Sequence, residues 1–276
     1  APAILPFTTV SAFTSQTFAD FALRPPTAAE ADAWKTPLTN DTSSGQALIA
    51  ANVGTAAWDV RSPVIRLFRA YFGRLPDLSG LDYWVGKYRA GTKVSAISSG
   101  FAASSEFKTK YGALSNRAFV TRIYTDVLGR TADQTGVNYW TGKLDTKAKT
   151  RGEVMAGFSE SNEYKTKTRN LVNVVTVYVA MIRAVPTQAQ LDDAITRTPL
   201  QLVTSLMNAP GYDKRFNTVA YPSITTTSLP TARKAKAYSV AISHYGGPPP
   251  LVWKVLSGKL PDGLTLSADG VISGTP

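Results

Sequence analysis

A pattern of twelve residues occurs twice in this chain, as "GRLPDLSGLDYW" at residues 73–84 and as "GRTADQTGVNYW" at 129–140. Each copy begins with the last two residues of a segment that has apolar residues at helical spacing. These segments are "VIRLFRAYFGR" (64–74) and "VTRIYTDVLGR" (120–130). Apolar residues three and four positions apart form one face of an amphipathic helix. Self-similarity at a fixed spacing is the signature of a repeated structural unit. The pattern therefore predicts a helical unit that occurs more than once.

Two weaker copies flank the strong ones, "FADFALRPPTAAEADAW" at 18–34 and "YVAMIRAVPTQAQLDDA" at 178–194. The first weak copy keeps a tryptophan at its end, whereas the second has Ala194 there. We therefore expect four units, at approximately 10–60, 61–115, 116–168 and 169–217, each with about three helices and a short fourth. Weak outer copies around strong inner ones are typical of the terminal units of a repeat array, which turn one face to solvent.

The two strong copies share an arginine, an aspartate, a glycine and a tryptophan at the same offsets. These are Arg74, Asp77, Gly80 and Trp84 in the first copy, and Arg130, Asp133, Gly136 and Trp140 in the second. We interpret this motif as the joint between two helices. The aspartate caps the following helix, and the arginine bridges to a carboxylate or to carbonyls that end the preceding helix. The glycine permits close packing, and the tryptophan lies on the core-facing stripe.

A ligand-binding interpretation of the same motif stays open. Four aromatic side chains could instead form stacking platforms for a sugar: Tyr83, Trp84, Tyr139 and Trp140. Full burial of the two tryptophans would exclude this alternative.

The composition changes after about residue 217. From residue 222 to 276 apolar and polar residues alternate, with turns rich in Gly and Pro, and the apolar positions include Tyr238, Val240, Ile242, Val252 and Val255. This pattern predicts a small Ig-like β-sandwich. Such a domain normally needs about 7 strands and roughly 100 residues, so we expect an incomplete sandwich. Either the chain is truncated or a neighbouring subunit supplies the missing edge.

Catalytic and metal-binding patterns are not found. The chain has no cysteine and one histidine, His244, which excludes thiolate sites and His-based metal clusters. The segment "SEFK" (105–108) matches S-x-x-K, but the companion motifs of Ser–Lys acyl enzymes are missing. The carboxylates of Asp192 and Asp193 are adjacent on a predicted helix and point in different directions. We expect no catalytic residues, no metal site and no cofactor.

The net charge of +11 is concentrated in the middle of the chain, because residues 1–60 carry −3, residues 61–220 carry +11 and residues 221–276 carry +3. Basic residues are scattered and mixed with acidic ones, so no specific nucleic-acid partner is indicated. An acidic first unit and a basic middle favour head-to-tail self-association. No apolar run reaches the length of about 18 residues that suggests a membrane span. We expect the "APA" start to be a new N-terminus that removal of a signal peptide or a pro-segment has left.

The helical part resembles the bacterial DUF4214 family, whose pattern runs GR-x-x-D-x-x-G-x-x-YW and then GF-x-x-S-x-EF. The first copy supplies Gly73, Arg74, Asp77, Gly80, Tyr83, Trp84, Gly100, Phe101, Ser104, Glu106 and Phe107, and the second supplies Gly129, Arg130, Asp133, Gly136, Tyr139, Trp140, Gly157, Phe158, Ser161, Glu163 and Tyr164. The end of the chain, "LPDGLTLSADGVISGTP" (260–276), is similar to an Ig-like family of bacterial surface proteins.

Both resemblances imply exported bacterial proteins, such as S-layer-associated proteins, adhesins and appendages, and neither implies a reaction. The sequence thus predicts a multidomain chain, α then β, with a helical repeat domain at 1–217 and an Ig-like domain at 222–276. We expect a non-enzymatic protein of the cell surface or extracellular space that acts in structural assembly or adhesion. Its expected partner is a second copy or another surface protein, and the alternative is a module that binds surface glycans.

Overall fold

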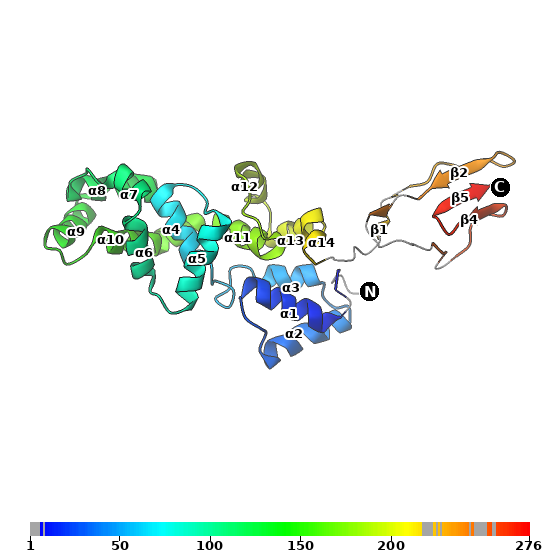
Figure 1. The fold of residues 1–276 in the computed structure, drawn as a ribbon, viewed down its shortest axis with the longest axis horizontal. Coiled ribbons are helices and arrows are strands. Elements are labelled where there is room, and N and C mark those ends of the chain that lie inside the picture. Colours follow the sequence, from blue (N-terminus) through cyan, green and yellow to red (C-terminus); the bar gives the residue numbers. More distant parts are fainter. Residues whose placement is uncertain are drawn as a thin grey trace. The chain divides into compact units, whose positions relative to one another are not determined.

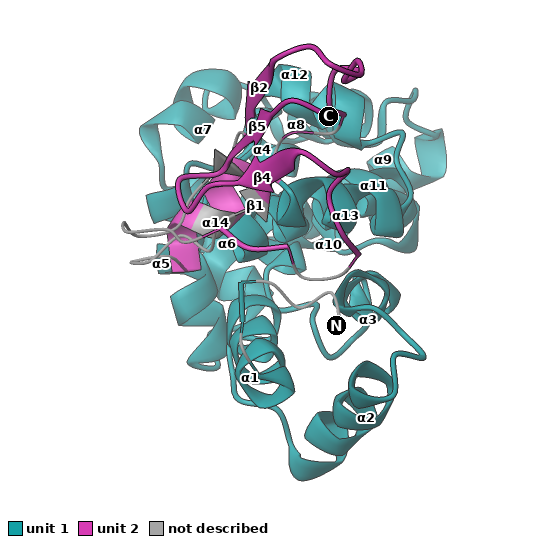
Figure 2. Ribbon diagram, turned by 90° about the vertical axis from the view of Figure 1, so that its right-hand side faces the viewer, with its two compact units in different colours: residues 1–208 teal, residues 209–276 magenta. Residues whose placement is uncertain are grey.

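The structure is a computed structural model that describes residues 6–7, 9–216, 223–224, 226, 228–242, 244–245, 253–255 and 258–276. Contacts divide the chain into two compact units, residues 1–208 and 209–276 (Figure 2). The described part is mostly helical and has a small antiparallel sheet near the C-terminus. The contact boundary groups helix α14 (Pro210–Phe216) with the C-terminal unit, whereas the sequence pattern predicts a helical domain that extends to residue 217.

The helices of residues 1–208 follow one another along the chain with short connections (Figure 1). The segment 10–60 contains α1 (Val10–Phe21), α2 (Ala28–Thr39) and α3 (Gly45–Asn52). The segment 61–115 contains α4 (Ser62–Phe72), α5 (Leu78–Arg89), α6 (Val94–Ala102) and α7 (Ser105–Tyr111). The next segment contains α8 (Asn116–Ile123), a π-helical turn η1 (Tyr124–Leu128), α9 (Gln134–Asp145) and α10 (Arg151–Ser159). It is followed by α11 (Asn162–Ile182), α12 (Gln188–Ala194) and α13 (Pro199–Met207).

Helix α11 differs from the expected pattern, because its 21 residues run without a break through the predicted unit boundary at 168–169. The short fourth helix of the third unit and the first helix of the fourth unit are therefore one helix. The corresponding junction after α7 has Gly112, and Ser115 caps the start of α8 by accepting a hydrogen bond from Ala118 N at 3.2 Å. Residues 162–182 contain neither Gly nor Pro, so nothing in the sequence ends the helix there.

The four units pack in two nested pairs, an arrangement that the order of the units along the chain does not predict. Helix α10 packs on α6 and α4, so the third unit lies against the second. Helix α13 packs on α3, and α11 on α1, so the fourth unit lies against the first (Figure 1). Helix α11 contacts members of both pairs, among them α4 and α13, and connects them.

Close approach of α6 and α10 depends on small residues. A Cβ atom placed on Gly152 would lie 2.9 Å from the Ser99 Cα, which real side chains do not tolerate. The Ser98 hydroxyl donates to the Gly152 carbonyl oxygen at 2.7 Å, and the Tyr71 hydroxyl lies 2.7 Å from the Ser98 carbonyl oxygen. Buried polar groups need such partners, so this hydrogen-bonded contact fixes how the second and third units meet.

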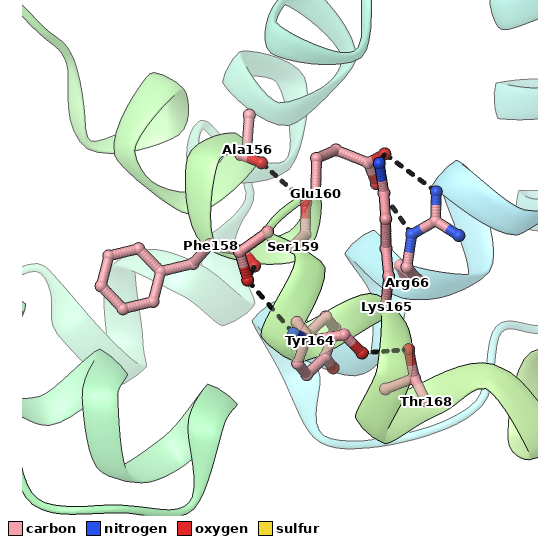
Figure 3. A network of polar contacts seen from close by, with 9 residues as sticks. Arg66, Ala156, Phe158, Ser159, Glu160, Tyr164, Lys165 and Thr168 are labelled. Atoms are coloured by element: carbon pink, nitrogen blue, oxygen red, sulfur yellow. Dashed lines mark hydrogen bonds and ion pairs between the residues drawn. The ribbon is translucent and has the colours of Figure 1, made fainter.

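A buried arginine strengthens the same contact (Figure 3). The Arg66 guanidinium on α4 donates from Nε and Nη2 to the two carboxylate oxygens of Glu160, at 2.9 and 2.8 Å. Glu160 directly follows α10, and Lys165 of α11 lies 3.3 Å from its carboxylate. Only 7% of the Arg66 side chain is exposed, against 25% for Glu160. The charge of Arg66 is therefore neutralised by a residue 94 positions away.

The C-terminal unit contains a three-stranded antiparallel sheet in the order β2-β5-β4, formed by β2 (Tyr238–Ala241), β4 (Leu264–Leu266) and β5 (Val271–Gly274). A separate two-strand ladder pairs β1 (Ser223–Ile224) with β3 (His244–Tyr245). Ile272 of β5 lies opposite Val240 of β2 and Leu266 of β4, which puts these apolar side chains on one face. Two packed sheets do not occur among the described residues, so the Ig-like sandwich is not confirmed. Val252, one of the predicted strand positions, lies outside the described residues.

Candidate functional site at the repeated joint

The aspartates of the joint cap the helices that follow them. Asp77 accepts a hydrogen bond from Gly80 N at 2.7 Å, and Asp133 accepts the same bond from Gly136 N at 2.7 Å. Both aspartates have extended backbone angles, as N-cap residues do. The hydrogen bond from the Gly80 N–H and, to a smaller extent, the bond from the Ser79 hydroxyl lower the pKa of Asp77. These carboxylates are ionised at neutral pH and are engaged in local structure.

The arginines of the joint bind carboxylates that lie far along the chain. Arg74 Nη2 lies 3.0 Å from Glu106 in α7, and Arg130 Nε lies 2.7 Å from Glu163 in α11. Each arginine therefore ties the end of the first helix of its unit to the start of the fourth. The hydrogen bonds from Arg130 hold the pKa of Glu163 below its ordinary value. Both pairs are close to half exposed, and exposed pairs contribute about 0–1 kcal/mol.

Two lysines that sequence reasoning missed complete the joint. Lys110 Nζ lies 3.4 Å from the carbonyl oxygen of Tyr71, and Lys167 Nζ lies 3.3 Å from that of Val127. A cation at these carbonyls satisfies acceptors that the helix leaves free and interacts favourably with the helix dipole. The signal for them was visible as the repeated tripeptide "KTK" at 108–110 and 165–167.

The tryptophans of the joint are half-buried and pack on glycines of the "GF" motif. A Cβ atom on Gly100 would lie 2.5 Å from Cη2 of Trp84, and one on Gly157 would lie 3.2 Å from Cη2 of Trp140. Gly136 has a similar role, because a Cβ atom there would lie 2.0 Å from the Tyr124 hydroxyl. The glycines thus make room for aromatic rings, and since neither tryptophan is fully buried, the stacking alternative is not excluded.

The tyrosines of the joint face solvent in both copies. Tyr83 is 57% exposed and Tyr139 is 56% exposed. Lys87 Nζ lies 5.6 Å from the centre of the Tyr83 ring, and Lys143 Nζ lies 5.5 Å from that of Tyr139. Helices α5 and α9 therefore each present an exposed aromatic ring beside a cation, at equivalent positions of the two units. The helix caps, the ion pairs and the core packing described for the joint do not explain why these two rings are exposed.

The joint of the third unit also contains a cavity of about 160 Å³. It is lined by motif residues and their neighbours, namely Tyr124, Leu128, Arg130, Trp140, Gly157, Phe158, Ser161 and Glu163. Its walls combine aromatic rings with one ion pair. Among the described residues, no group of three or more His, Asp or Glu side chains is placed to hold a metal ion. In that same part of the chain, we find no helix with the length and apolar character needed to cross a membrane.

Comparison with known families agrees with the motif. Residues 62–109 and 98–168 match the sequence model of DUF4214, a domain of unknown function. The first match lies within the second helical unit, and the second match runs from within α6 to the end of the third unit, so the resemblance is confirmed over residues 62–168. Comparison with curated proteins and with solved structures found no match.

Proposed function

We propose that this protein is a non-enzymatic structural protein of the bacterial cell surface or extracellular space, which assembles or adheres through protein–protein contacts. The observation that carries the proposal is the use of the repeated motif. Its aspartates cap helices, its arginines pair with distant carboxylates and its glycines accommodate aromatic rings. Such a motif maintains a scaffold, and a scaffold of this kind acts through the surfaces that it presents.

The C-terminal sheet supports assembly as the role of that scaffold. Within the described residues, β2 and β4 are the outer strands, and each pairs only with β5. The outer sides of such strands can pair with a strand of another chain. The apolar face is also only partly covered, since Val240 and Leu266 remain half-exposed on either side of the buried Ile272. A neighbouring subunit that completes this sheet would cover both features.

Light scattering and negative-stain microscopy at two salt concentrations test the proposal. We expect regular oligomers or polymers. The double variant Ser239→Lys/Thr265→Lys places charge on the two outer strands, β2 and β4. It should dissociate the oligomers or polymers. A matched control, Thr166→Lys/Asn170→Lys, adds the same charge to exposed positions of α11 and should leave assembly unchanged. A monomer at both salt concentrations would contradict self-assembly, and equal assembly of the two double variants would contradict the role of the sheet.

A second candidate function, glycan binding, is favoured by the exposed rings of Tyr83 and Tyr139 beside their lysines. Aromatic rings that face solvent at repeated positions suit stacking against sugars. Retention of the protein on insoluble polysaccharide, lost in the variant Tyr83→Ala/Tyr139→Ala, would support this function.

A further inference from the structure

We infer that the cavity in the joint of the third unit is a binding site for a single neutral sugar ring. This inference rests on the second candidate function, glycan binding, and assigns it a site other than the exposed tyrosines. The cavity has a volume of about 160 Å³ and belongs entirely to the third unit, with walls from η1, α9, α10 and α11 and from the connections between them.

The cavity lies where the second unit has a phenylalanine ring. Leu128 is at the position equivalent to Phe72. The ring of Phe72, at the end of α4, stacks on Phe101, with ring centres 5.5 Å apart and planes inclined by 16°. The Arg74 guanidinium carbon lies 5.2 Å from the centre of the Phe72 ring. In the third unit the equivalents of these two neighbours, Phe158 and Arg130, line the cavity. Leucine has no ring to place between them, so open space remains.

The walls suit a sugar because they combine apolar faces with hydrogen-bonding groups. Trp140 and Phe158, with ring centres 5.9 Å apart, supply aromatic surface for the C–H face of a sugar ring. The Glu163 carboxylate can accept hydrogen bonds from sugar hydroxyls, and the Arg130 guanidinium can donate to them. Burial and, to a smaller extent, the charge of Asp133 raise the pKa of Tyr124, so this phenol remains protonated at neutral pH.

The charges around the cavity favour a neutral ligand over an anion. Arg130 binds Glu163 at 2.7 Å and lies 3.6 Å from Asp133. Lys167 is the other cation that acts on Glu163. Two cations and two carboxylates therefore balance each other. An anionic ligand would need a positive charge that is not already paired.

The cavity is open to solvent on one side, and its size limits the part of the ligand that it holds to one ring. At ~30 Å³ for each molecule of liquid water, 160 Å³ corresponds to about five waters. This is below the ~300 Å³ at the lower end of pockets for drug-sized ligands. A ligand limited to one ring makes few contacts, so we expect a dissociation constant in the millimolar range. We therefore expect each chain to recognise one sugar residue weakly, and assembly of several chains on one polysaccharide would strengthen the binding.

Proton–nitrogen NMR of the indole N–H groups tests the inference. The probes are methyl β-D-glucopyranoside, methyl β-D-galactopyranoside and methyl N-acetyl-β-D-glucosaminide, added to the full chain. We expect at least one glycoside to shift the indole signal of Trp140 in a saturable manner, while the signal of Trp84 stays in place. The variants Trp140→Phe and Trp84→Phe assign the two signals. Methyl β-D-glucuronide should bind no more tightly than its neutral counterpart.

Two reciprocal variants make the test specific. Leu128→Phe should abolish the Trp140 shift, because it installs the ring that fills this space in the second unit. Phe72→Leu should create a cavity beside Trp84 and make its signal respond. No shift with any glycoside, or an equal shift in Leu128→Phe, would overturn the cavity assignment. If the protein still binds insoluble polysaccharide in that case, and loses binding in Tyr83→Ala/Tyr139→Ala, the glycan function stands and only the cavity is wrong. If the unmodified protein shows neither a Trp140 shift with any glycoside nor binding to insoluble polysaccharide, glycan binding as a whole is rejected.

Discussion

Replacing Glu160 by glutamine tests whether the ion pair to Arg66 holds the second and third units together. The substitution keeps the size of the side chain and removes the charge that neutralises a guanidinium with 7% exposure. An exposed pair with similar geometry, Arg74 with Glu106, occurs within the second unit and has exposures of 48% and 46%. Glu106→Gln is therefore a matched control in which mainly the burial of the pair differs.

The expected magnitudes follow from this difference in burial. Removing one partner of a buried pair costs about 3–5 kcal/mol, since it leaves an uncompensated charge. The 25% exposure of Glu160 lets water reach Arg66 in part, so we expect a loss of about 2–3 kcal/mol for Glu160→Gln. For Glu106→Gln we expect about 0–1 kcal/mol. A change of 1 kcal/mol moves Tm by about 2–4 °C in a unit of 150–250 residues, so Glu160→Gln should lower Tm by about 4–12 °C.

Urea unfolding followed by the helical circular dichroism signal measures both free energies. A double variant, Arg66→Met/Glu160→Leu, should recover much of the lost stability, because it leaves no buried charge unpaired. The reasoning would be refuted if Glu160→Gln and Glu106→Gln differed by less than about 0.5 kcal/mol, within the range for ordinary surface substitutions.

Two further predictions concern single residues. Gly100→Ala should lower Tm, because its Cβ would lie 2.5 Å from Trp84. The Cβ of Gly86→Ala would meet nothing within 4 Å, so this variant should raise Tm through the higher helix propensity of alanine. Tm shifts of the same sign for the two variants in thermal unfolding would contradict this. The hydrogen bond from Arg24 lowers the pKa of Glu30 from 4.5 to about 2. Because the folded-state pKa is the lower one, this stabilisation is present above pH 4.5 and is lost as pH falls toward 2. Glu30→Gln should therefore reduce the decline of the urea midpoint over this interval, and an unchanged decline would show that the pair contributes nothing.

Local features of the structure were predictable because they depend on neighbours in sequence. The capping roles of Asp77 and Asp133 follow from a short polar residue placed directly before an apolar helical stripe. The Arg130–Glu163 pair was only half predictable. The sequence indicated an arginine in need of a carboxylate, but the partner lies 33 positions away. Lys110 and Lys167 could have been found from the repeated "KTK", had the ends of the preceding helices been known.

The pairing of units could not be predicted, because it depends on which surfaces fit together in space. Arg66 of the second unit and Arg122 of the third are equivalent in sequence, yet Arg66 pairs with Glu160, whereas Arg122 pairs with Asp126 four positions along the chain, in the π-helical turn η1. The equivalent of Glu160 in the second unit is Ala103. A helical pattern repeats in both units, but only the three-dimensional contact selects which arginine is buried.

The amino-acid sequence by itself determined that the chain is helical over its first two hundred residues, that the helices recur as a unit, and that the joints of the second and third units are each capped by an aspartate. These properties follow from periodicity and capping, which act within a few residues of the chain. Only the tertiary structure decided that the first unit lies against the fourth and the second against the third, that α11 is continuous, and that a cavity lined by Leu128 lies in the joint of the third unit. These depend on packing between residues far apart in sequence, where one side chain more or less changes which surfaces can meet.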